Sequence, residues 1–192
     1  KTRFIAGDPV LGREIEKIAE GVAYGSGLPK EGVQEIHYLR MRMERELAGE
    51  DETRFNLKKG RGGLVDIEFL TQMLQLAHGH RLRALRRRGT LKALQKLFEC
   101  KILKSAEYKL LFEGYLFLRR LDHRMRLERD QSIDAFEADP ARLEGIARAL
   151  YNGRQEPGKK EPSGRRLLRD YEAKREKIRA CYERHFIGAS KS

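Results

Sequence analysis

The chain has 192 residues, of which 40% are hydrophobic and 36% are charged, and its formal net charge is +12. This length is typical of one domain or two small ones, and no stretch approaches the roughly 18 consecutive apolar residues of a membrane-spanning helix. Two cysteines cannot form a disulfide framework, so we expect reduced thiols in a cytoplasmic protein that has no membrane partner.

In the first half of the chain, apolar residues recur with helical spacing. A helix is predicted over 9–23, with Leu11, Ile15, Ile18 and Val22 on one face. A second helix is predicted over 31–47. After a glycine-rich loop, a third helix is predicted to begin near Leu64 and to continue to about residue 77.

The second half continues in the same way. Thr90 is the expected N-cap of a short helix that ends near 97, and a long helix is predicted over 105–129. Asp139 followed by a proline predicts the start of a helix that reaches 150. We therefore predict an all-α fold, a bundle of about six to seven helices with no substantial sheet. It forms a single helical domain over 1–192, with a main bundle (1–150), a mobile loop (151–164) and a C-terminal helix (165–187).

The basic residues raise the expectation of an anionic partner. Most of them alternate with acidic residues, as on solvated helix faces. One concentrated run contains Arg81, Arg83, Arg86, Arg87 and Arg88. This run either lies in solvent between two helices or docks an acidic partner or a phosphate. The absence of tryptophan and the 8% aromatic content argue against a base-stacking surface for nucleic acid.

The most informative stretch is the glycine-rich segment 55–69. Cationic side chains flank Gly60, Gly62 and Gly63 where a helix begins, and free backbone N–H groups at such a place favour an anion. The alternative is a structural turn whose acidic residues complement the helix N-terminus. Asp66 and Glu68 diverge by about 200° on a helix, so they do not form a joint metal site. We predict no metal site in this chain.

This stretch also carries a family resemblance. The run from Lys58 through the three glycines to Asp66, Glu68 and Phe69 resembles the glutamine synthetase adenylyltransferase (adenylyl-removing) family. Further segments that follow the order of this family are 5–8, the helix with Tyr38, Arg40, Arg42 and Glu44, and the segments 90–94 and 115–124. The resemblance covers roughly residues 3–130.

The resemblance implies a protein with two tandem halves, each a nucleotidyltransferase core followed by a helical domain. One half transfers AMP from ATP to a tyrosine of glutamine synthetase, with Mg²⁺, and the other half removes it. This chain is similar to the helical domain alone, and more similar to that of the C-terminal, adenylylating half. Since no Gly-Ser pair with a following Asp-x-Asp occurs here, the nucleotidyltransferase core is absent from this chain. We expect the chain alone to bind no cofactor and to be inactive.

By the same resemblance, seven residues are expected at the nucleotide and substrate cleft of the longer enzyme: Asn56, Lys58, Gly60, Gly62, Gly63, Asp66 and Glu68. None of them is expected to be catalytic. The implied partners are glutamine synthetase, the PII signalling protein and the enzyme's own core. Three alternatives stay open: the adenylyl-removing half, a regulatory module that docks glutamine synthetase or PII through the arginine run, and a basic helical RNA-binding protein, suggested only by charge.

Overall fold

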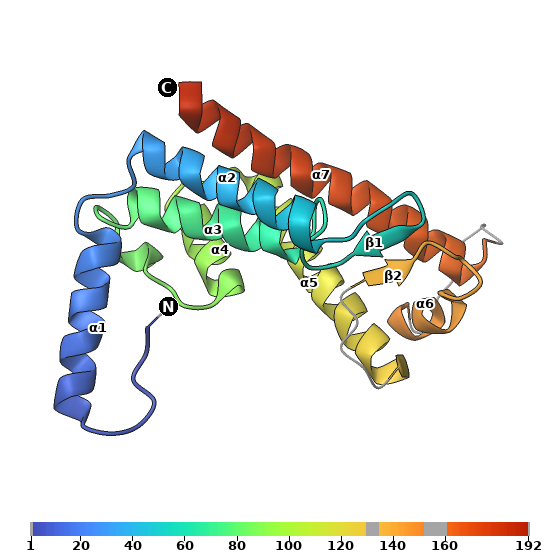
Figure 1. Ribbon diagram of the computed structural model, residues 1–192, viewed down its shortest axis with the longest axis horizontal. Helices are drawn as coiled ribbons and strands as arrows, with labels where there is room; N and C mark the ends of the chain where they lie inside the picture. Colours follow the sequence, from blue (N-terminus) through green and yellow to red (C-terminus); the bar gives the residue numbers. More distant parts are fainter. Residues whose placement is uncertain (1, 130–134, 152–160, 192) are drawn as a thin grey trace.

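The computed structural model describes residues 2–129, 135–151 and 161–191. Within these ranges the chain forms seven α-helices, a short 3-10 helix and one two-stranded sheet (Figure 1). The helices are α1 (Pro9–Tyr24), α2 (Lys30–Leu47), α3 (Leu64–His78), α4 (Thr90–Glu99), α5 (Ser105–Arg129), α6 (Glu144–Leu150) and α7 (Ser163–Lys191). The other elements are η1 (Arg83–Leu85), β1 (Arg54–Asn56) and β2 (Ala135–Glu137). The all-α prediction is confirmed.

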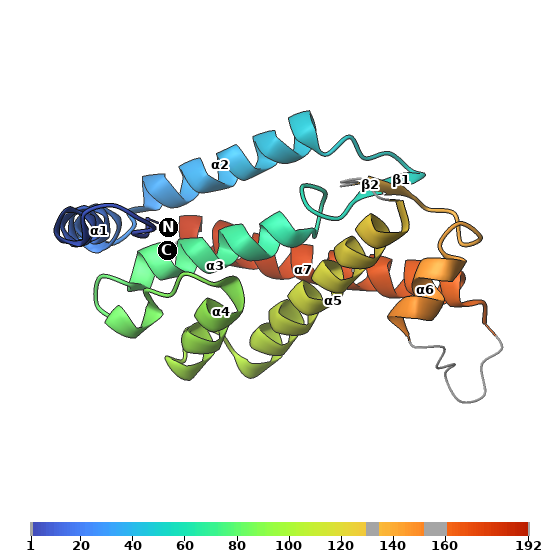
Figure 2. The ribbon, with the colours of Figure 1, turned by 90° about the horizontal axis from the view of Figure 1, so that it is seen from below.

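The helix α7 runs along the bundle and packs against α2, α3, α5 and α6 (Figures 1 and 2). Its apolar stripe is buried, because Leu167, Tyr171, Ile178, Cys181 and Tyr182 are each at most 1% exposed. Although α7 has 29 residues, neither it nor any other helix in the described ranges is apolar enough to cross a membrane.

The helix α3 lies in the middle of the bundle and contacts α2, α4, α5 and α7. Its apolar face is buried, since Ile67, Leu70 and Leu74 are all buried. Packing on several sides holds α3 in one position. The same packing therefore fixes the glycine loop, which leads into the N-terminus of α3.

A small antiparallel sheet closes the end of the bundle near α6. The strands β1 and β2 pair with Phe55 opposite Phe136, and both rings lie against Tyr171 of α7, with ring centroids 5.4 and 5.1 Å away. The short segment before the glycine loop is therefore extended. The aromatic contacts attach the start of that loop to the core.

The helix α1 behaves differently from the rest of the chain. It projects from one end of the bundle (Figures 1 and 2). The helix prediction over 9–23 is confirmed, yet its apolar face is not in the core. Leu11, Ile15, Ile18 and Val22 are 55%, 48%, 67% and 84% exposed. The sequence pattern is that of a buried face, and the described part of the chain does not cover it.

Some predicted boundaries are wrong. Thr90 is the first helical residue of α4, and Gly89 takes the N-cap position, so the Thr90 side chain does not cap the helix. The Asp139 side chain accepts from the amide of Ala141, but this forms only a turn, and α6 begins at Glu144. The predicted loop over 151–164 falls largely on 152–160, outside the described residues, and α7 already begins at Ser163.

Candidate functional site

The glycine loop is held by hydrogen bonds from its own backbone. The Gly60 amide donates to the Asn56 carbonyl (3.1 Å), and the Gly63 amide donates to the Gly60 carbonyl (3.1 Å). The Gly62 amide donates to the carboxylate of Asp66 (2.8 Å). The next three amides, at 64–66, donate to carbonyls at 57, 58 and 63.

Two side chains take the remaining amides of the loop. The Asn56 side-chain oxygen accepts from the amides of Lys58 (3.0 Å) and Lys59 (2.9 Å). The Glu50 carboxylate accepts from the Arg61 amide (3.0 Å). The expectation that free backbone amides here favour an anion is therefore corrected, because every amide from 58 to 66 already has an acceptor inside the chain.

Glycine is required at the tip of the loop for two reasons. Gly62 has φ +66°, a left-handed conformation that side chains disfavour. A Cβ atom on Gly62 would also lie 2.0 Å from the carbonyl oxygen of Arg175. The loop thus lies directly on the backbone of α7, and this contact leaves no room for any side chain.

A buried ion network lies beneath the loop. Asp66 and Arg40 are both 0% exposed, and the Arg40 Nε lies 2.6 Å from Asp66 Oδ1. The other side of the Asp66 carboxylate lies 3.4 Å from Nη1 of Arg179. Glu44 joins the two arginines, with its Oε2 2.9 Å from Arg40 Nη2 and 2.8 Å from Arg179 Nη1. Arg40 also donates to the Gly60 carbonyl (2.9 Å), which ties the network to the loop.

A second set of ion pairs joins the loop to α7 nearer the surface. Arg61 lies 3.1 Å from Glu183 and 3.3 Å from Glu176. Arg175 lies 3.1 Å from Glu50, and its Nε donates to the Arg61 carbonyl (3.2 Å). Loop and helix are therefore joined by charge as well as by close backbone contact.

The electrostatics of the network reflect its burial. Removal from water raises the pKa of the Asp66 carboxyl, while the guanidinium groups of Arg40 and Arg179 oppose this shift. Nearer the surface, hydrogen bonding and charge from Arg179 and then Arg61 outweigh partial burial and lower the pKa of Glu183. Such a network holds its members in fixed positions, because losing one partner leaves another charge buried and unpaired.

The seven predicted cleft residues do not share one surface. Asn56, Asp66 and the three glycines are buried, whereas Lys58 and Glu68 are half-buried. Asp66 faces the arginines, but Glu68 accepts a hydrogen bond from the Tyr115 hydroxyl (3.2 Å). The two carboxylates have different partners, as the helical spacing predicts. That these seven residues line a nucleotide cleft stays a prediction.

The arginine run divides into two parts. Arg86 lies over the Tyr24 ring, 5.0 Å from its centroid, and 3.5 Å from Glu20, while Arg88 lies 2.5 Å from Glu16. These two arginines contact α1, and a docking role for either of them also stays a prediction. The others, Arg81, Arg83 and Arg87, are exposed, and a docking role for them stays a prediction.

Sequence reasoning missed the residues of α7 that complete the network: Arg175, Arg179 and Glu183. A signal for them was present. Arg175 and Arg179 follow Tyr171 at four-residue intervals, so both arginines lie on the helix face that carries the buried aromatic residues. Charged residues on an otherwise apolar face indicate buried ion pairs.

The fold and this site define a class of all-α domain in which a glycine loop enters a helix and is held by buried ion pairs. A family model described as GlnD PII-uridylyltransferase matches residues 34–186. A bifunctional glutamine synthetase adenylyltransferase/adenylyl-removing enzyme of Streptomyces coelicolor is 33% identical over 155 residues, which cover 80% of this chain and 16% of that protein. Proteins of the same name from Streptomyces avermitilis and Leifsonia xyli are each 32% identical and cover 98% of this chain and 18% of their own length.

The chain therefore belongs to the family of this model, together with the bifunctional glutamine synthetase adenylyltransferase/adenylyl-removing enzymes that it resembles. The resemblance seen in the glycine-loop motif is confirmed. The chain spans less than a fifth of the length of these relatives.

Proposed function

We propose that this chain is the helical domain of a longer cytoplasmic glutamine synthetase adenylyltransferase. In that enzyme it forms one wall of the cleft where AMP passes from ATP to a tyrosine of glutamine synthetase. The observation that carries the proposal is the likeness to the Streptomyces avermitilis protein, which extends over 98% of this chain. Mg²⁺ and ATP are assigned to the nucleotidyltransferase core, because no Asp-x-Asp motif occurs in this sequence.

Within this function the glycine loop is a rigid support. Since its backbone amides are already bonded, the contact with phosphate or with the acceptor tyrosine region falls to the Lys58 side chain. Asn56 holds the Lys58 amide, and Asp66 holds the Gly62 amide. These residues act by positioning Lys58. Its ammonium group stabilises a phosphate most strongly when the loop that carries it is held in one position.

The exposed face of α1 supports the enzyme's own core as a neighbour. Four large apolar residues lie along it, and covering such a side chain contributes about 1.5–3 kcal/mol. A second candidate function is the docking of glutamine synthetase or PII. It is supported by three arginines that are exposed next to the bundle, Arg81, Arg83 and Arg87. We assign the chain to the adenylylating half. Its segment 62–69 is more similar to the corresponding segment of that half than to that of the adenylyl-removing half.

The test compares Lys58→Ala with Lys59→Ala in the longer enzyme, since both lysines are half-buried neighbours in the same loop. We expect Lys58→Ala to lower the initial rate of AMP transfer about ten- to a hundredfold, which corresponds to about 1.4–2.8 kcal/mol. Lys59→Ala should change it little, and the melting temperatures should match.

A normal rate of AMP transfer in a folded Lys58→Ala enzyme would show that the loop has only a structural role. As a further arm, the 192-residue chain alone should not label glutamine synthetase with AMP. Transfer by the chain alone, at the rate of the longer enzyme, would refute the assignment as a helical domain without the core.

A further inference from the structure

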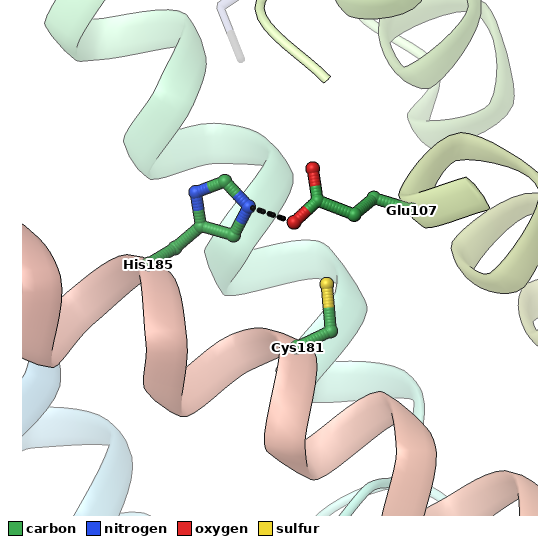
Figure 3. Close-up of side chains that lie close together, drawn as sticks. All are labelled: Glu107, Cys181 and His185. Carbon is green, nitrogen blue, oxygen red and sulfur yellow. Dashed lines mark hydrogen bonds and ion pairs between the residues drawn. The ribbon is translucent and has the colours of Figure 1, made fainter. Parts of the chain in front are cut away.

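A separate cluster of titratable side chains lies between α5 and α7 (Figure 3). Cys181 and His185 are four residues apart on α7 and share one face, and Glu107 comes from the first turn of α5. The His185 Nε2 lies 3.2 Å from the Glu107 Oε1. One donor atom from each residue, a sulfur, a ring nitrogen and a carboxylate oxygen, lies within 4.8 Å of the other two.

Contrary to the sequence-based expectation of no metal site, we propose that Glu107, Cys181 and His185 form a Zn²⁺ site with water as the fourth ligand. Thiolate, imidazole and carboxylate are the ligands that Zn²⁺ takes in proteins, usually in tetrahedral geometry. Zinc bonds of about 2.0–2.3 Å at tetrahedral angles place neighbouring donors roughly 3.3–3.6 Å apart. The nitrogen and oxygen donors already lie 3.2 Å apart. The sulfur lies within 4.8 Å of both, so it has to approach by no more than about 1.3 Å, a distance that side-chain rotation supplies.

The surroundings give the site an entry path and support for its ligands. An open hollow of about 400 Å³, lined in part by His78, Arg184 and His185, gives solvent access to the imidazole. The second carboxylate oxygen of Glu107 accepts from the Lys104 amide (3.2 Å), which orients the carboxylate from behind. The Arg184 guanidinium lies 3.4 Å from Glu107 but is 65% exposed, so it can turn toward water when a cation binds.

Metal binding at this place requires the loss of protons. Burial raises the pKa of the Cys181 thiol to about 11, so the thiol is protonated at neutral pH and releases one proton when Zn²⁺ binds. The imidazole must present the Nε2 lone pair to the metal and keep its hydrogen on Nδ1. Without metal, the same residues form an ordinary pair of Glu107 with His185 beside a core cysteine, and this is the competing account.

The test titrates the chelator-treated 192-residue chain with Co²⁺, which reports a thiolate ligand by a charge-transfer absorption band. We expect one equivalent of Co²⁺, displaced by Zn²⁺ and not by Mg²⁺, with release of a proton. Cys181→Ser and His185→Gln should remove the band or weaken binding at least about tenfold. The matched controls Cys100→Ser and His78→Gln should bind as the original chain does.

His185→Gln keeps the test interpretable, because the His185 side chain is 20% exposed and its loss need not unfold the bundle. Circular dichroism establishes that each variant is folded. Absence of the charge-transfer band in the original chain would overturn the proposal. Equal binding by folded His185→Gln, or loss of binding in His78→Gln alone, would place the metal elsewhere and would overturn it as well.

Discussion

The helix α1 and the glycine loop invert the usual relation between residue type and burial. On α1, four apolar side chains are between 48% and 84% exposed. Beneath the glycine loop, Arg40 and Asp66 are fully buried and Arg179 is 4% exposed. Burial therefore depends on whether a side chain finds its partner within the same chain. The charged residues find theirs, whereas the described residues leave the apolar face of α1 uncovered.

The two regions also differ in what a mutation can cost. A buried charge loses its water, which costs several kcal/mol, and only opposite charges and hydrogen bonds offset that loss. The network therefore tolerates no missing partner. An exposed apolar side chain contributes almost nothing to the stability of the isolated chain, so the face of α1 should tolerate change until it is covered.

The largest expected effect is at Asp66. Asp66→Ala leaves Arg40 buried without its nearest carboxylate and should lower the free energy of unfolding by about 3–5 kcal/mol. Glu68→Ala is the matched control and should cost no more than about 1.5 kcal/mol, since it loses one hydrogen bond at a half-buried site. Denaturant unfolding measures both, and equal losses would contradict the special role of the network.

Two glycines with the same backbone conformation separate the cost of that conformation from the cost of a clash with α7. Gly49 and Gly62 have φ +57° and +66°, but only at Gly62 would a Cβ meet another atom within 4 Å. Gly49→Ala should cost about 1–2 kcal/mol from the backbone alone. Gly62→Ala should cost about 2–5 kcal/mol, because the clash with the Arg175 carbonyl adds to it. Similar melting temperatures for the two variants would show that the loop can move away from α7.

A smaller effect is expected from pH at His37, which lies beside the network. Burial, and then the charge of Arg179, lower the pKa of His37, and its ring lies 3.2 Å from the Tyr182 hydroxyl. The unfolded chain therefore binds the proton more readily, so this contribution to stability is present above pH 6.5 and is lost as the pH falls. The melting temperature should drop between pH 7.5 and about 5.5, and the drop should be smaller in His37→Gln. An identical drop in both proteins would assign the effect to other groups.

The smallest effect is expected on α1 itself. Ile18→Lys should change the stability of the isolated chain by no more than about 0.5 kcal/mol, whereas Ile67→Ala in the core should cost about 2–5 kcal/mol. In the longer enzyme, Ile18→Lys should lower stability measurably if the core covers this face. Unchanged stability in both settings would remove the support that α1 gives to that contact.

The amino-acid sequence predicts the positions of most helices, because an apolar residue every three or four positions is a local property that needs no knowledge of the fold. It also indicated the glycine loop, the helix after it and the divergence of Asp66 from Glu68. The residues that resemble the family motif led to a relationship that the wider comparison confirms. That the seven motif residues line a nucleotide cleft remains a prediction from this resemblance.

Which faces are covered and which charges meet depends on the tertiary structure. It left the apolar face of α1 in solvent, gave the loop amides acceptors within the chain, and turned Arg86 and Arg88 toward α1. It also brought Glu107 beside Cys181 and His185, more than 70 residues away in the sequence. This is because the spacing of apolar residues is a property of a single helix, whereas burial and pairing depend on which helices pack together.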